Sequence, residues 1–293
     1  MSYYKILGLE REPFSTTPDP DFFYQSTEHK SALYRLRVAI ELRRGLSVIL
    51  GDVGVGKTTL SRKLVQLLKA ESNTLMSVVL NPIYESEEQF LADMIERFHI
   101  DTGAQGGRAL RNLDYMNTIE HFLFTKNVEE SKAIVLLIDE SQKLISPCLE
   151  VLRTLLNYET NEYKILQVVL MGQMELLPRI SGIRNLWDRI ALKYVINPLG
   201  QDEVKELIQF RLKTAGYVSK YPLFSDSAFT AIYNYTQGSP RKIAMICHDA
   251  LEYLVMHNKE IVNEDVVREL IKMDVKPASR LLNPESYSLN PEP

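Results

Sequence analysis

A glycine-rich turn that ends in a lysine and two threonines carries the strongest chemical signal in the sequence. It reads Gly51, Asp52, Val53, Gly54, Val55, Gly56, Lys57, Thr58 and Thr59, a full match to the pattern G-x-x-x-x-G-K-S/T. Glycines let the backbone wrap closely around phosphate oxygens, and a helix that begins near Lys57 adds the positive end of its dipole. We therefore predict an ATP site in which Lys57 contacts the β- and γ-phosphates and Thr58 gives its hydroxyl to Mg²⁺.

An acidic pair follows a second apolar stretch. Residues 134–138 are uninterrupted by polar side chains, and Asp139 and Glu140 come directly after them. Ligands of open α/β sheets bind at the carboxyl ends of the strands, so the pair should face the glycine-rich turn. There, Asp139 would hold Mg²⁺ through water, and Glu140 would orient the water that attacks the γ-phosphate. Alone, such a pair is as often a helix-capping feature; the pairing with residues 51–59 favours the metal site.

Two amides are weaker candidates for the same site. Gln173 follows the apolar residues 166–171, and the usual strand order would place its side chain beside the acid pair. A surface-loop amide explains Gln173 equally well. Asn81 could hold Glu140 in an inactive rotamer, but Asn81-Pro82 is also a turn signal, and that reading is slightly favoured.

Three arginines are candidates for contact with developing phosphate charge. Arg184 and Arg189 precede the last apolar stretch, where a residue of one subunit could reach ATP bound to its neighbour as an arginine finger. Arg241 follows Pro240 at the expected start of a helix, which places a fixed charge on a closing lid. For each arginine, a solvated or salt-bridged side chain is the ordinary reading.

A parallel sheet is needed to bring these residues together, and the hydropathy pattern predicts one. Five short apolar stretches are expected to form buried strands, separated by segments of helical periodicity. The expected strands are residues 46–50, 75–80, 134–138, 166–171 and 191–196, and the expected helices are 58–70, 87–98, 112–124 and 147–158. This alternation is typical of an α/β P-loop NTPase core with a five-stranded parallel sheet.

The pattern changes after Asn197-Pro198. Four consecutive helical segments, residues 202–215, 225–236, 241–257 and 263–272, predict a small all-helical lid. We therefore expect an aromatic and proline-containing N-terminal segment at 1–29, the P-loop core at 30–200, the lid at 201–275 and a flexible tail at 276–293. The N-terminal aromatic residues Phe14, Phe22, Phe23 and Tyr24 are expected to brace the core rather than contact adenine.

Composition favours a soluble cytoplasmic protein. Hydrophobic residues make up 45% of the 293 residues and charged residues 25%, the balance of an ordinary globular chain. The formal net charge of −4 gives no strong nucleic-acid footprint. Cys148 and Cys247 have neither metal-ligand spacing nor the density of a disulfide scaffold. The sequence shows no signal peptide and no apolar stretch that would span a membrane.

These motifs, together with the opening of the chain, resemble the AAA+ ATPases of the ExeA/GspA type in type II secretion and the related MshM pilus-biogenesis ATPases. The similarity covers about residues 3–272 and lies most clearly in residues 4–9, 12–15, 17–20, 23–24, 81–82, 156–160 and 171–176. It implies an AAA+ core and lid and an ATP-dependent homo-oligomer, for example a ring. It also implies a secretion or pilus protein partner at the inner membrane.

The resemblance assigns roles to individual residues. It implies Lys57, Thr58, Asp139 and Glu140 as the catalytic core. It also implies Gln173 as sensor 1, Arg241 as sensor 2 and Arg189, with Arg184 second, as the finger.

The sequence departs from this family in two places. The usual Asp-Glu-Ala-Gln reads Asp139-Glu140-Ser141-Gln142, which leaves both acids in place. Full-length secretion members continue into a transmembrane helix and a peptidoglycan-binding domain, whereas this sequence stops after the lid. We therefore expect docking through a protein partner instead of a direct membrane span.

Assembly of a secretion or pilus apparatus is the favoured function, and three others share parts of the pattern. A DNA-associated ATPase of the TnsC or MuB type, which regulates transposition target choice, has the same core and lid. The basic residues Arg35, Arg37, Arg43 and Arg44 would suit it, but the acidic net charge and the N-terminal motif disfavour DNA. A small-molecule kinase would need an acceptor pocket, and the helical lid argues against it. A scaffold that hardly hydrolyses ATP is disfavoured by Glu140.

Overall fold

The protein divides into two compact units in the computed structural model, which describes residues 2–17, 19–101 and 112–274. One unit is Pro18–Pro198, and the other combines Met1–Thr17 with Leu199–Pro293. Sequence reasoning placed residues 1–29 in a segment of their own, whereas residues up to Thr17 here group with the C-terminal helices. The expected flexible tail at 276–293 lies outside the described residues.

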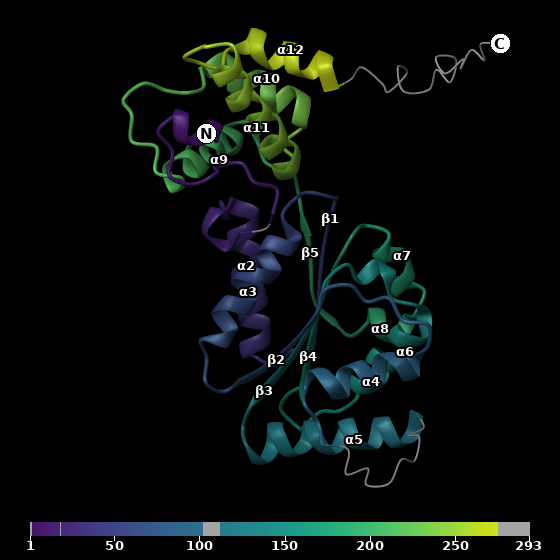
Figure 1. The fold of residues 1–293 in the computed structure, drawn as a ribbon. Coiled ribbons are helices and arrows are strands. Elements are labelled where there is room, and N and C mark those ends of the chain that lie inside the picture. Colours follow the sequence, from purple (N-terminus) through teal and green to yellow (C-terminus); the bar gives the residue numbers. More distant parts are fainter. Residues whose placement is uncertain (1, 18, 102–111, 275–293) are drawn as a thin grey trace, which may run out of the picture. The chain divides into compact units, whose positions relative to one another are not determined.

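A five-stranded parallel sheet forms the centre of the unit Pro18–Pro198 (Figure 1). Its strands are β1 (Leu46–Gly51), β2 (Thr74–Val79), β3 (Ala133–Ile138), β4 (Leu166–Gly172) and β5 (Ile190–Ile196). Their order in the sheet is β2-β3-β4-β1-β5, and each neighbouring pair is parallel. The five expected strands are confirmed, because their observed ends differ from the expected ones by no more than one residue.

Helices cover both faces of this sheet because the central strands direct alternate side chains into two apolar layers. Val48 and Leu50 of β1 belong to one layer, and Ile49 belongs to the other. The first layer contains α4 (Glu87–Arg97), α5 (Asn112–Phe124) and α6 (Ser146–Leu155), and the second contains α2 (Thr27–Glu41) and α3 (Lys57–Lys69). Figure 1 shows these two groups of helices on opposite sides of the strands.

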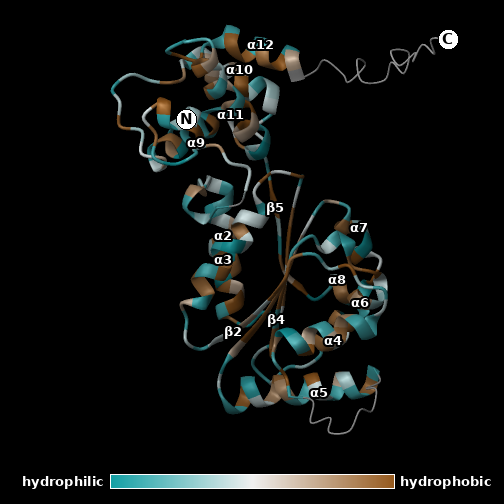
Figure 2. Ribbon diagram, viewed as in Figure 1, coloured by the Kyte–Doolittle hydropathy of each residue, from teal (hydrophilic) through white to brown (hydrophobic). Residues whose placement is uncertain are grey.

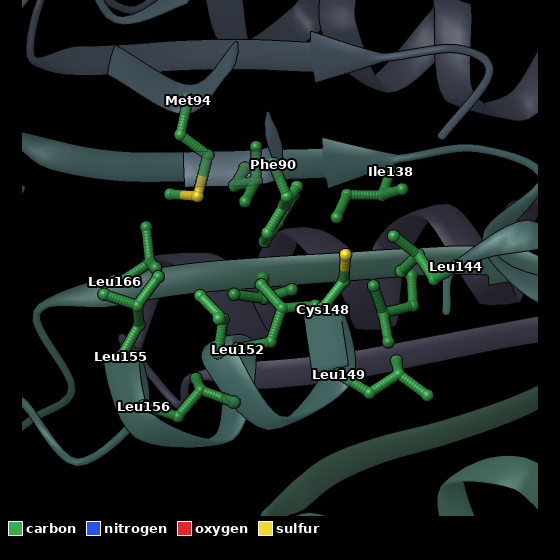
Figure 3. Packing of buried hydrophobic residues seen from close by; sticks show 14 of the residues in the cluster. Phe90, Met94, Ile138, Leu144, Cys148, Leu149, Leu152, Leu155, Leu156 and Leu166 are labelled. Atoms are coloured by element: carbon green, nitrogen blue, oxygen red, sulfur yellow. The ribbon is translucent and has the colours of Figure 1, made fainter. Parts of the chain in front are cut away.

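The first layer is densely packed (Figure 3). Phe90 and Met94 of α4 and Leu152 of α6 enclose Ile138 and Leu166 of the sheet, and all five side chains are buried. Burial of each such side chain contributes about 1.5–3 kcal/mol relative to exposure. The last residue of β3, Ile138, is packed in this layer, and the acid pair follows it directly.

The fifth strand was expected to be buried, and this prediction is wrong. In β5, Ala191, Lys193 and Val195 are exposed, while Leu192 and Tyr194 pack against the layer of α2 and α3. The physical reason is its position, because β5 lies at the edge of the sheet and its alternate side chains fall outside the helical layers. Figure 2 shows that apolar colouring prevails in the strands of the sheet.

The second unit is helical. Its C-terminal part contains α9 (Gln201–Thr214), α10 (Asp226–Thr236), α11 (Pro240–Met256) and α12 (Glu264–Asp274), close to the four helices expected. Two of these helices have side-chain N-caps: Ser225 Oγ accepts from Ala228 N–H at 3.2 Å, and Asn263 Oδ1 accepts from Val266 N–H at 3.1 Å. No helix in the described part of the chain has both the length and the apolar character needed to cross a lipid bilayer.

The N-terminal segment packs onto these helices. Its short helix α1 (Tyr3–Ile6) contacts α11, where Tyr3 Oη lies 2.8 Å from His248 Nδ1. Glu10 N–H donates to the carbonyl of Ala215 at 2.8 Å. Phe14 is buried and meets Phe224 edge-on, with ring centroids 6.1 Å apart. Phe14 therefore braces the apolar core of the helical unit, and Phe23 belongs to the layer of α2 and α3 in the other unit.

Candidate nucleotide-binding site

The glycine-rich turn joins the end of β1 to the start of α3. Because β1 ends at Gly51 and α3 begins at Lys57, strand, loop and helix follow in the order that the motif requires. Gly54 and Gly56 have φ angles of 85° and 100°, a region that side-chain-bearing residues rarely adopt. The first backbone N–H groups of α3 have no partner within their own helix, so this turn can accept an anion.

The ammonium of Lys57 lies at this loop. Its side chain is 6% exposed, and Nζ donates to the carbonyls of Gly51 at 2.7 Å and Asp52 at 2.8 Å. Burial lowers the pKa of Lys57, while the nearby carboxylates of Glu140, Asp139 and Asp52 oppose that shift. A desolvated cation held among these groups can interact strongly with phosphate oxygens.

Thr58 and Asp139 lie side by side, although they are far apart in the sequence. The Thr58 hydroxyl lies close enough to the Asp139 carboxylate to favour its ionised form, and Asp139 is 1% exposed. Burial raises the pKa of Asp139, and the hydrogen bonds from Glu140 N–H and Thr58 act in the opposite direction. Hydroxyl and carboxylate oxygens are the hard ligands that Mg²⁺ prefers, so these two residues fit the ion.

Magnesium usually shares its coordination between one or two protein groups, water and substrate phosphates. In the part of the chain that the structure describes, no group of three or more His, Cys, Asp or Glu side chains could hold a metal by itself.

Glu140 is held by a neighbour that sequence reasoning missed. Glu140 adopts a left-handed backbone conformation with φ of 51°, and Gln142 Nε2 donates to Glu140 Oε2 at 2.7 Å. The other end of the same amide, Gln142 Oε1, accepts from the backbone N–H of Gln173 at 3.1 Å. Gln173 therefore reaches the acid pair through its backbone and Gln142. The signal was visible, since Gln142 follows Asp139-Glu140 by two positions.

Asn81 does not contact Glu140 directly among the described residues. Its Oδ1 accepts from Lys143 Nζ at 3.0 Å, and the same ammonium lies 4.0 Å from Glu140 Oε2. Asn81 is thus connected to Glu140 through Lys143.

The three candidate arginines lie in different environments. Arg189 is half-buried, and its Nη1 donates to the carbonyl of Arg153 at 2.8 Å. Arg184 is the first residue of α8 (Arg184–Trp187) and is exposed, and its guanidinium has no hydrogen-bond or ion-pair partner within the described ranges. Arg241 is also exposed; it is the second residue of α11, in the helical unit.

Sequence reasoning also missed a contact between α2 and the carbonyl of Val55 in the glycine-rich loop. His29, near the start of α2, is 2% exposed, and its Nε2 lies 2.9 Å from the carbonyl oxygen of Val55. No motif pointed to it, because a lone histidine in the first turn of a helix has no signature of its own.

The basic residues of α2 and the turn after it are largely engaged within the chain. Arg37 lies 3.8 Å from Glu71, and the guanidinium of Arg43 lies over the ring of Tyr163 at 4.4 Å. Arg35 lies over Tyr194 at 5.5 Å. These contacts agree with a solvated helix face.

Comparison with known proteins identifies the domain. The AAA domain family matches residues 40–180. A protein named General secretion pathway protein A, from Aeromonas hydrophila, is 38% identical over 251 residues, which are 85% of this chain and 44% of that relative. The chain therefore spans less than half the length of this relative. The resemblance expected from the motifs is confirmed by both matches.

Solved structures share the fold at low sequence identity. The ORC2 protein of Aeropyrum pernix superposes with a TM-score of 0.64 at 14% identity, over 93% of this chain and 74% of that one. The Cdc6 protein of Pyrobaculum aerophilum gives a TM-score of 0.64 at 18% identity, over 87% of this chain and 70% of the other. These similarities confirm the expected α/β P-loop fold with its helices.

Proposed function

We propose that this chain, in which residues 40–180 match the AAA domain family, is an ATPase that binds Mg-ATP at residues 51–59, hydrolyses it and forms an ATP-dependent homo-oligomer. The observation that carries this proposal is the meeting of Lys57, Thr58 and Asp139 at the carboxyl ends of β1 and β3, with Glu140 next in the chain. Phosphoryl transfer depends mainly on positioning and electrostatic stabilisation, which such a group of side chains supplies.

Each residue has a separate task in this proposal. The loop N–H groups and Lys57 hold the β- and γ-phosphates, while the Thr58 hydroxyl and the Asp139 carboxylate hold Mg²⁺. The ion, when bound, would neutralise charge that develops on the phosphate oxygens. Glu140 orients and polarises the attacking water. Gln173 as sensor 1 and Arg241 as sensor 2 remain proposals that rest on the resemblance.

For the arginine finger, we propose Arg184 ahead of Arg189, the reverse of the order favoured from the sequence. A finger must leave its own subunit and reach the nucleotide of a neighbour. The guanidinium of Arg189 is already engaged by the Arg153 carbonyl, whereas Arg184 is exposed. This supports Arg184 as the residue that acts in trans.

For the biological role, we propose assembly of a secretion or pilus apparatus through a protein partner at the cytoplasmic face of the inner membrane. The similarity to General secretion pathway protein A supports this role. DNA-regulated target choice is not favoured, because Arg35, Arg37 and Arg43 already contact groups of their own chain.

The test is the ATPase rate as a function of protein concentration, with and without double-stranded DNA, alongside light scattering in ATP. We expect the ATPase rate per protomer to rise with protein concentration and to be unchanged by DNA. Lys57→Ala should abolish nucleotide binding, and Glu140→Gln should bind ATP without turning it over. Strong stimulation or filament growth on DNA would favour the DNA-associated alternative, and unchanged ATP affinity in Lys57→Ala would exclude this loop as the site.

A further inference from the structure

The side chain of His29 forms a continuous hydrogen-bonded link from α2 to the glycine-rich loop. Ser26 Oγ lies 2.6 Å from His29 Nδ1, and His29 Nε2 lies 2.9 Å from the Val55 carbonyl oxygen. Both contacts are buried. A buried hydrogen bond has no competing water and fixes the direction of its acceptor more strictly than an exposed one.

The Val55 carbonyl oxygen determines which nitrogen of the His29 ring carries the proton. A carbonyl oxygen can only accept, so the proton on His29 must be at Nε2. In the neutral ring this leaves Nδ1 as an acceptor for the Ser26 hydroxyl. Ser26 Oγ in turn accepts from the backbone N–H of His29 at 3.3 Å as the N-cap of α2. The position of the imidazole is therefore set by the first turn of α2.

This link determines which way the following peptide group faces. In a planar trans peptide, the carbonyl of one residue and the N–H of the next point in opposite directions. Because His29 holds the Val55 carbonyl on the α2 side of the loop, the Gly56 N–H is directed to the opposite side.

We propose that His29 is a positioning residue that aims the Gly56 N–H at phosphate oxygens of the bound nucleotide. The inference rests on the proposed function and deepens it, because it names a group outside the motif that sets the geometry of the anion-binding loop.

Gly56 is fitted to this neighbour. A Cβ placed on Gly56 would lie 2.8 Å from His29 Nε2, and Gly56 has a φ of 100°. The glycine and the imidazole therefore occupy one tightly packed site, in which neither can change without moving the other.

The surroundings keep the imidazole from moving. The ring of Phe23 meets His29 edge-on at 5.1 Å. Tyr194 Oη donates to Glu28 Oε2 at 2.7 Å, which ties the first turn of α2 to β5, the strand that pairs with β1. The hydrogen-bonded link from Ser26 through His29 to Val55 therefore starts in a helix that is itself bonded to the sheet.

Two substitutions of His29 distinguish the effect of its hydrogen bond from the effect of its volume. His29→Gln keeps an N–H donor near the position of Nε2, whereas His29→Met fills similar space without a donor. Tyr84→Phe is the matched control, because it removes another hydrogen bond of a buried side chain, the 2.6 Å contact to Asp93, away from the loop. The measurements are the affinities for fluorescent ATP and ADP analogues, the melting temperature, and the Gly56 amide signal in ¹H–¹⁵N spectra.

We expect His29→Met to bind both nucleotides about tenfold more weakly, which corresponds to ~1.4 kcal/mol. Its Gly56 amide signal should no longer shift when ADP is added. His29→Gln should recover most of the affinity and the shift, and Tyr84→Phe should retain both even if its melting temperature falls.

Wild-type affinity and a wild-type Gly56 response in His29→Met would overturn the inference. Equal losses in the Met and Gln variants would also overturn it, because they would show that only packing matters. If the wild-type protein itself binds no nucleotide, the proposed function fails instead, so the two failures can be distinguished.

Discussion

Gln142 Nε2 donates a hydrogen bond of 2.7 Å to Glu140 Oε2, and this contact couples the carboxylate that we propose to orient water to the neighbouring strand. The same side chain accepts from the backbone N–H of Gln173, which directly follows β4. A Cβ on Gly172 would lie 3.1 Å from Gln142 Oε1, so β4 leaves little room for the amide to turn. The orientation of Glu140 therefore depends on the end of β4.

Replacement of Gln142 by Leu should reduce kcat more than it raises KM. The carboxylate of Glu140 would lose the donor that holds its rotamer, while the phosphate-binding loop would keep its contacts. We expect kcat to fall about tenfold and KM to change less than about threefold, the pattern of an interaction that matters for the chemical step. Steady-state ATPase assays measure both constants.

Lys143→Ala serves as the control for this prediction. Its ammonium lies 4.0 Å from Glu140 Oε2 and is exposed to solvent, so its removal should change kcat by less than about threefold. A Gln142→Leu variant with wild-type kcat would show that the amide does not set the position of Glu140.

The arginine finger can be identified by mixing variants. Arg184→Ala should bind ATP but lose assembly-dependent hydrolysis. Addition of Glu140→Gln protomers should restore activity, because they still supply Arg184 to the intact sites of their neighbours. ATPase assays on defined mixtures provide the measurement.

Arg189→Ala should behave differently from Arg184→Ala. It removes the donor to the Arg153 carbonyl and should lower the free energy of unfolding by about 1–2 kcal/mol, while the folded protein retains its activity. Full activity of Arg184→Ala, or loss of hydrolysis in a stably folded Arg189→Ala, would return the role to Arg189.

Sequence reasoning could predict the strands and the motif residues because their signals are local. The apolar residues 134–138 and the acid pair after them are contiguous, and the glycine-rich turn specifies its own strand–loop–helix context. The parallel sheet then brings Asp139 to Thr58 without any further information. These parts of the site follow from short stretches and one rule of topology.

The supporting contacts could not be predicted, because they join distant segments through side-chain packing. His29 and Val55 are separated by 26 positions, and Glu10 meets Ala215 from the other end of the chain. Neither pair has a spacing rule, since the contact depends on how helices lie on a sheet or on one another. The exposed face of β5 was also missed. The order of strands depends on contacts between distant segments, so hydropathy does not reveal which strand lies at the edge of the sheet.

Both cysteines should resist thiol reagents in the folded protein. Cys148 and Cys247 are buried and free, and burial raises the pKa of Cys148 from 9.0 to about 11. The reactive thiolate is therefore scarce at pH 8. Labelling should require unfolding, and fast labelling of the native protein would contradict the burial of Cys148 in α6 or of Cys247 in α11.

The same shift predicts how stability depends on pH. A thiol with a pKa that is higher in the folded state contributes stability below pH 9.0, and this contribution is lost as the pH rises toward about 11. Tyr158 acts in the same direction, since burial and a hydrogen bond to Glu120 raise its pKa from 10.0 to about 12. Urea unfolding should give a midpoint that falls above pH 9, and a constant or rising midpoint would contradict both shifts.

Phe14 should be essential for the stability of the helical unit, although it lies near the start of the chain. It is 1% exposed and packs on Phe224, so Phe14→Ala leaves a cavity and should cost about 3–5 kcal/mol. Hydrogen exchange should show lost protection in α9 and α10, while β1, β3 and β4 keep theirs. Ile6→Ala, at an exposed position of the same segment, should change stability by less than about 0.5 kcal/mol. Equal, small effects of the two substitutions would show that the N-terminal segment does not form part of this core.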